Sequence, residues 1–144
     1  MKRKLPVYFA FCFKTLFFIA VFVGLLSACS NEQSVTLGPQ QWQELSFRVE
    51  TRPTPMRVGM NEFIVLANRE HKPGVGLVVM LRMGDSGEWR QAIQDGYTGV
   101  YRRAMRVDDP ATQSLSVHVR RAKSDDKDDE TVLLFPLNQK RGVQ

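Results

Sequence analysis

Apolar and polar residues alternate over several short segments of the chain from residue 45 onward. Apolar side chains occupy every second position in residues 45–50, as Leu45, Phe47 and Val49, and the same alternation recurs in residues 114–121. A period of two places such side chains on one face of a β-strand. These segments therefore predict half-buried strands with one face turned toward a core.

Turn-forming residues divide the chain into seven expected strands. Proline cannot donate to a strand ladder, and glycine and aspartate favour turns, so residues 52–55, 84–87 and 108–110 separate the apolar segments. The expected strands cover residues 42–50, 62–67, 75–83, 88–93, 97–107, 114–121 and 130–137. No segment after residue 28 shows a sustained helical period. The pattern predicts an all-β fold, a seven-stranded antiparallel immunoglobulin-like sandwich that follows an N-terminal signal peptide.

Residues 1–28 differ from the rest of the chain. Their first half is basic, and an apolar run of twelve residues, TLFFIAVFVGLL, follows Lys14. Twelve residues in a helix cover roughly 18 Å, whereas the hydrocarbon core of a bilayer is about 30 Å thick. A signal peptide over residues 1–28 is therefore favoured. A permanent N-terminal anchor helix is the alternative.

The residues that end this segment resemble a known processing site. Leu26-Ser27-Ala28-Cys29 resembles a lipobox, the recognition site of bacterial lipoprotein signal peptides. The resemblance implies cleavage before Cys29 and lipidation of its thiol, with palmitate among the attached chains, so that the membrane is reached through the lipid anchor. It further implies a place in the bacterial cell envelope with the domain facing the periplasm. Ser30, rather than Asp, follows the cysteine, which favours the outer membrane over the inner. The alternative is that Cys29 is an ordinary thiol.

The chain from Cys29 onward divides into three parts. Residues 29–41 are polar and contain Gly38-Pro39, so they are expected to form the lipidated cysteine and a flexible tether. Residues 42–137 form the expected β-sandwich domain, and residues 138–144 a basic tail. The chain has two cysteines, Cys12 and Cys29. Since neither lies in the domain, an internal disulfide and a cysteine-based zinc site are excluded there.

Charge argues against a nucleic-acid partner. The chain has 20 Lys and Arg residues against 15 Asp and Glu, a net charge of +5. Four of those basic residues and no acidic residue lie in residues 1–28. The basic character therefore belongs mainly to the leader, and the remaining chain is close to neutral. A nucleic-acid role based on the whole-chain charge is not expected.

A second resemblance covers the middle of the chain. Residues 55–66 contain a proline followed by Gly59, Asn61 and Phe63 and an apolar strand, and Gly99-Val100-Tyr101 comes later. Together with the Gly/Pro loop and valine-rich strand of residues 72–80, this order is similar to the YtkA-like and FixH-like families. The resemblance implies a small exported or membrane-anchored β-sandwich domain. Some relatives are linked to copper handling and cytochrome oxidase assembly.

Soft side chains supply the candidate metal ligands. Copper(I) prefers thioether and imidazole groups, and Met56, Met60 and His71 are the candidates near the turns. Met80 and Met83 are separated by an odd number of positions, so they are expected on opposite faces of one strand. No His-x-Met run is present, and methionine more often fills a core. No cofactor is expected, and a copper-handling accessory using Met and His ligands is the alternative function.

Arginines in two neighbouring expected strands form the candidate partner-binding set. If those strands pair, Arg102, Arg106, His118 and Arg120 form one basic patch. Such a patch can dock lipid headgroups or an acidic partner. The alternative is a solvated sheet face whose charges discourage edge pairing.

Catalytic signatures are missing from the sequence. The chain contains no Gly-x-Ser-x-Gly, and neither histidine has a serine and an acid arranged around it in sequence. We therefore expect no enzyme. The expected function is that of a lipid-anchored, non-enzymatic envelope module that binds an envelope protein or supports its assembly, a partner that the sequence does not identify.

Overall fold

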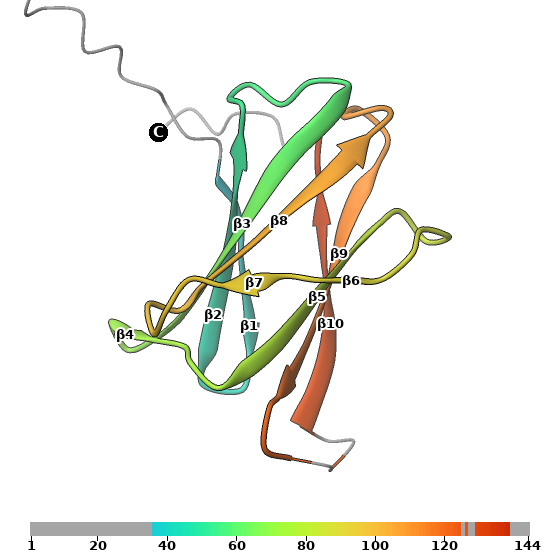
Figure 1. The fold of residues 1–144 in the computed structure, drawn as a ribbon. Helices are drawn as coiled ribbons and strands as arrows, with labels where there is room; N and C mark the ends of the chain where they lie inside the picture. Colours follow the sequence, from blue (N-terminus) through green and yellow to red (C-terminus); the bar gives the residue numbers. More distant parts are fainter. Residues whose placement is uncertain (1–35, 125, 127–128, 139–144) are drawn as a thin grey trace, which may run out of the picture. The chain divides into compact units, whose positions relative to one another are not determined.

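The computed structural model describes residues 36–124, 126 and 129–138, and Cys29 with the leader lies outside them. Within the described part the chain forms two antiparallel sheets (Figure 1). The first has the order β1-β2-β3-β8-β7, with β4 also paired to β3, and the second has the order β10-β9-β5-β6. No helix among the described residues is long and apolar enough to cross a membrane. The strands are β1 (Thr36–Trp42), β2 (Leu45–Arg52), β3 (Gly59–Arg69), β4 (Lys72–Pro73), β5 (Leu77–Met83), β6 (Arg90–Gln91), β7 (Ile93–Gln94), β8 (Val100–Val107), β9 (Ser114–Arg121) and β10 (Glu130–Pro136).

The alternating side chains of both sheets meet in one core. Phe47 and Phe63 of the first sheet and Phe135 of the second are completely buried, as is Tyr101. Burial of aromatic and branched side chains is the main favourable contribution to folding such a domain. The expected all-β fold with antiparallel sheets is confirmed.

The first strand lies where the sequence predicts a tether, so that prediction is wrong from Thr36 onward. β1 pairs antiparallel with β2, with Leu37 opposite Val49, and Leu37 has no exposed surface. The register shifts between Leu37 and Gln40, at the Gly38-Pro39 step. A β-bulge of this kind interrupts the period of two, so the sequence shows a Gly-Pro dipeptide and not a strand. The domain therefore begins at least six residues earlier than Trp42.

The segment expected to form one strand over residues 88–93 instead joins the two sheets. β6 pairs with β5 of the second sheet, and β7 pairs with β8 of the first. Between them Ala92 is buried, and its N–H donates to the carbonyl of Val79 at 2.8 Å. The segment crosses one side of the domain from sheet to sheet in Figure 1. Each sheet therefore receives only a two-residue edge strand on this side.

Candidate functional site: the open edge of β8

The short pairing of β7 leaves most of the outer edge of β8 uncovered. β7 pairs with β8 only at Arg102 and Tyr101. Further along β8, the chain that would continue β7 has turned to the second sheet, where Gln91 pairs with Met80. No described strand takes its place beside the second half of β8.

Two hydrogen bonds fix which backbone groups of β8 face that edge. The carbonyl of Gly99 accepts from Ala67 of β3, and the carbonyl of Val100 accepts from Asp95 on the β7 side, both at 2.8 Å. Backbone groups alternate between the two sides of a strand, and the register of β8 with β3 is continuous. The N–H and C=O groups of Ala104 and Arg106 therefore point away from β3, toward the edge that β7 does not reach.

A groove of about 640 Å³ lies beside this edge. Its apolar part is exposed, since Ile93 is 71% exposed and Met60 is 63% exposed. Both side chains line the same groove from the two sides of β8, and exposed apolar side chains that gather at one groove are typical of binding surfaces. The groove is lined by residues of β3, β6, β7 and β8, among them Met60, Arg90, Ile93, Arg102, Arg103 and Ala104. We refer to the groove and the edge groups of Ala104 and Arg106 as the β8 edge site.

The arginines of this site differ in whether a nearby carboxylate neutralises their positive charge. Arg102 Nη2 lies 2.9 Å from Asp95 Oδ2, and Arg106 Nε lies 3.0 Å from Asp108 Oδ1. Arg103 has no ion-pair partner among the described residues; its register opposite Phe63 puts it on the inner face, where it is half-buried at the rim. A half-buried guanidinium without a carboxylate partner gains more favourable interaction free energy from a new anion than does an exposed guanidinium that already has an ion-pair partner.

Buried contacts hold β8 in place behind the site. The Tyr101 hydroxyl donates to the carbonyl of Gly74 at 3.0 Å, and burial raises the pKa of that hydroxyl above its usual value, so it remains a donor. Gly99 has a φ of +73°, and a Cβ there would lie 2.5 Å from the carbonyl oxygen of Ala67. The open edge is therefore presented by a rigid strand, which limits the entropy lost on binding.

The four residues of the predicted basic patch do not come together. Arg102 and Arg106 belong to β8 of the first sheet, whereas His118 and Arg120 belong to β9 of the second. The strands do not pair, because the chain crosses between the sheets after residue 107. Their side chains lie on the outer faces of opposite sheets, so the single patch is a wrong prediction and only the arginines of β8 belong to the β8 edge site.

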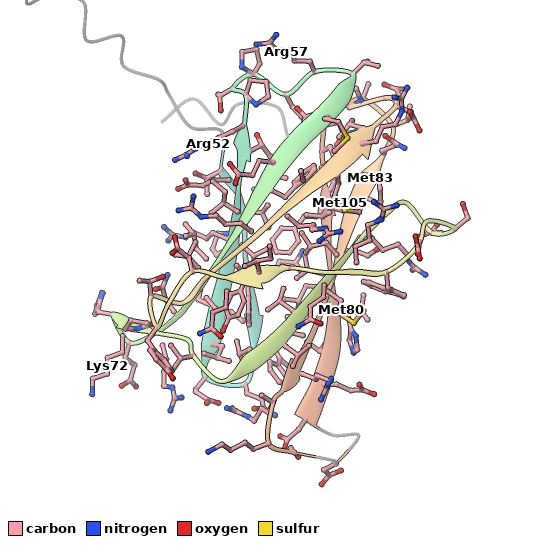
Figure 2. The ribbon with its side chains drawn as sticks, viewed as in Figure 1. Arg52, Arg57, Lys72, Met80, Met83 and Met105 are labelled. Atoms are coloured by element: carbon pink, nitrogen blue, oxygen red, sulfur yellow. The ribbon has the colours of Figure 1, made fainter. Side chains whose placement is uncertain are left out.

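The three candidate metal ligands are also separated. Met56 packs against the core, and Met60 lies at the start of β3. His71 is in the turn after β3, at the far end of this eleven-residue strand, and eleven residues of strand span roughly 35 Å. Figure 2 shows Arg57 and Lys72 at these opposite ends. Met56, Met60 and His71 therefore cannot bind one ion.

A second group of side chains gathers on the outer face of the second sheet. Met80 lies opposite His118 in the register of β5 and β9. His118 Nε2 is 3.1 Å from Glu130 Oε2, and its ring centroid is 5.7 Å from that of Trp89. Met83, by contrast, packs against the core, so the prediction that Met80 and Met83 face opposite ways is confirmed; both are labelled in Figure 2.

No protein-family model, curated protein or solved structure matches this chain. The two resemblances noted in the sequence therefore stay predictions, and Cys29 lies outside the described residues. The sites must be interpreted from their own geometry.

Proposed function

We propose that the protein is a lipid-anchored, non-enzymatic module of a bacterial envelope that binds an extended segment of a protein partner as an added strand on β8. The observation that carries the proposal is the unpaired edge of Ala104 and Arg106 beside an exposed apolar groove. In strand addition, the main-chain hydrogen bonds supply affinity, and alternate side chains supply specificity.

The chemistry of the edge defines the partner segment. On the inner rim, a residue of the added strand beside Arg103 would carry a carboxylate, which supplies the ion pair that Arg103 lacks. On the outer side, a residue beside Ala104 would be apolar and would cover Ile93, now 71% exposed. The partner is therefore an extended segment with acidic and apolar residues in alternation.

The strand order supports an immunoglobulin-like sandwich. In their order across the first sheet, β2, β3, β8 and β7 occupy the places of strands A, B, E and D. The order β10-β9-β5 corresponds to strands G, F and C of the other sheet. β1 is an addition beside β2. The YtkA-like and FixH-like resemblance, which implies the same class of exported domain, fits this order.

The lipid anchor and the point where the domain begins together limit how far the module can extend from the membrane. Under the lipobox reading, Cys29 is lipidated and the domain is held at the outer membrane, facing the periplasm. Only residues 30–35 separate Cys29 from Thr36. Six residues span at most about 20 Å, so the partner segment would be met close to the membrane surface.

Proline at position 104 tests strand addition. The N–H of Ala104 points to the open edge, so Ala104→Pro removes one donor from the binding edge and places the ring in the path of an added strand, while the ladder to β3 is kept. We expect capture of the partner by in-cell photo-crosslinking from position 93 to fall at least about tenfold, a loss of about 1.4 kcal/mol.

Ala104→Val is the matched control, since it adds a side chain at the same exposed position and keeps the N–H. It should capture the partner as wild type does, and both variants should keep the thermal unfolding midpoint within a few degrees. Equal capture by the proline variant, in a protein that remains folded, would rule out strand addition on β8.

A further inference from the structure

One end of the domain carries both the start of β1 and the loop between β2 and β3. Because β1 and β2 are antiparallel, Thr36 lies opposite Glu50, two residues before β2 ends at Arg52. Residues 53–58, which we call the β2–β3 loop, follow directly, and Figure 1 shows this loop at the upper end of the domain. The chain therefore enters the domain at the end that carries the β2–β3 loop.

The described chain also ends there. The N–H of Leu137 donates to the carbonyl of Gln113, in the turn between β8 and β9, at 3.1 Å. Figure 1 shows this turn at the same upper end. The sequence beyond Asn138 contains Lys140 and Arg141 and no acidic residue. Basic residues of the sequence therefore continue from the end that carries the β2–β3 loop.

Buried hydrogen bonds hold the β2–β3 loop in one conformation. Asn61 is only 1% exposed, and its Oδ1 accepts from the N–H of Arg57 at 3.1 Å. Its Nδ2 donates to the carbonyls of Arg57 and Gly59 at 2.7 and 3.0 Å. The Thr54 hydroxyl donates to the carbonyl of Thr51 at 2.7 Å. A loop held in this way loses little conformational entropy when its tip meets a surface.

The tip of the loop combines an apolar side chain with positive charge. Val58 is 67% exposed, and Pro55, Arg57 and Arg52 are exposed as well. Neither guanidinium forms an ion pair with a described residue, and Figure 2 shows Arg57 at the extreme upper end of the domain. A guanidinium matches the geometry of phosphate oxygens, and apolar side chains beside cations are typical of segments that lie in a membrane interface.

The acidic side chains at this end are mostly engaged. Asp108 pairs with Arg106 at 3.0 Å, and Asp109 accepts from a backbone N–H and a threonine hydroxyl of its own turn. Residues 84–89, which include two acidic residues, extend from the side of the domain in Figure 1. Residues 30–35 add one acidic residue, Glu32. The β2–β3 loop therefore presents uncompensated positive charge.

We infer that the β2–β3 loop docks on an anionic lipid surface, with Arg52 and Arg57 on lipid phosphates and Val58 in the headgroup layer. The inference rests on the lipid anchor of the proposed function. The anchor makes docking an intramolecular event at high effective concentration, so a contact of few residues is sufficient. Val107 pairs with Gly59, so docking holds the open second half of β8 beside the membrane.

A fluorophore at the tip of the loop tests docking in the mature lipoprotein. Cys29 is the only cysteine after the leader, and its thiol carries the lipid under the proposed function, so Val58→Cys introduces one reactive thiol. The labelled protein is reconstituted in vesicles of phosphatidylethanolamine and phosphatidylglycerol that contain nitroxide-labelled headgroups. Quenching should be at least about threefold stronger at position 58 than in Lys72→Cys, at the other end of β3, roughly 35 Å away.

Charge variants separate headgroup binding from mere proximity. In the Val58→Cys protein, Arg52→Gln/Arg57→Gln should lower the ratio of docked to undocked protein at least about fivefold, since each arginine near an anionic surface contributes roughly that factor. High salt should lower the ratio too, as should phosphatidylcholine vesicles. Lys72→Gln/Arg120→Gln removes the same charge from exposed positions elsewhere and should leave the ratio unchanged.

Flotation with the vesicles reports the anchor separately. Protein that floats but is quenched equally at positions 58 and 72, or whose docking is unchanged in the folded Arg52→Gln/Arg57→Gln variant, would overturn the docking inference alone. Protein that does not float would overturn the anchor and docking together. Thermal unfolding establishes that each variant is folded. Ala104→Pro should dock as wild type does, so failure of strand addition on β8 is distinguishable from failure of docking.

Discussion

Replacing Leu37 with alanine should lower the free energy of unfolding by about 2–5 kcal/mol, the usual cost of truncating a buried leucine. Leu37 is completely buried opposite Val49, and a cavity there would remain next to the core. The loss is a large part of the 5–15 kcal/mol that holds a domain of this size together. Denaturant unfolding of the mature protein measures it.

Thr36→Ala is the matched control in the same strand. Thr36 is exposed, and surface substitutions change stability by less than about 0.5 kcal/mol. If Leu37→Ala also stayed within this range, β1 would contribute nothing to the fold and residues 36–41 would behave as the tether that their composition predicts.

Replacing Cys29 with serine should abolish both the lipidation of the protein and the cleavage of its leader. A hydroxyl in place of the thiol cannot take up the lipid at the lipobox, and each buried CH₂ of a lost acyl chain contributes about 0.8 kcal/mol to anchoring. The variant should incorporate no labelled palmitate and should keep its leader. Labelling and the shift in mass on cleavage are measured together.

Cys12→Ser separates the role of Cys29 from that of cysteine in general, because Cys12 lies within the expected leader. This variant should be labelled and cleaved as wild type is. Palmitate incorporation at the wild-type level in Cys29→Ser would contradict the lipoprotein assignment and favour a permanent N-terminal anchor.

The period of two was sufficient to predict the interior of the long strands. The inward residues expected in residues 45–50 and 114–121 are buried, including Phe47 and Val117, although Ser116, expected to face outward, is buried as well. The same signal failed for β1, because the bulge at Gly38-Pro39 leaves only Leu37 and Trp42 as apolar positions. A strand so interrupted has no periodicity to detect.

Sheet membership explains the larger error in the predicted sites. Alternation tells which side chains face the core, but it does not tell which sheet a strand joins. Arg106 and Arg120 were correctly predicted to face solvent, yet β8 and β9 belong to different sheets. Likewise, the pairing of Met80 with His118 depends on long-range register, which one sequence does not specify.

The open edge of β8 could not be predicted from local sequence patterns either. It exists because the chain turns at Ala92 toward Val79 of the second sheet, and this contact joins residues distant in sequence. The sequence signal was limited to a run of arginines from position 102, which indicates a solvated edge as readily as a binding site.

Amide hydrogen exchange along β8, in the mature protein alone and in the complex captured from cells, tests the central claim most directly. Alone, the amides of Ala104 and Arg106 should exchange at least about a hundredfold faster than those of Arg103 and Met105, which face β3. In the complex, Ala104 and Arg106 should become protected while Arg103 and Met105 change little. Protection of Ala104 and Arg106 in the protein alone, or continued fast exchange in the complex, would show that no partner strand is added at this edge.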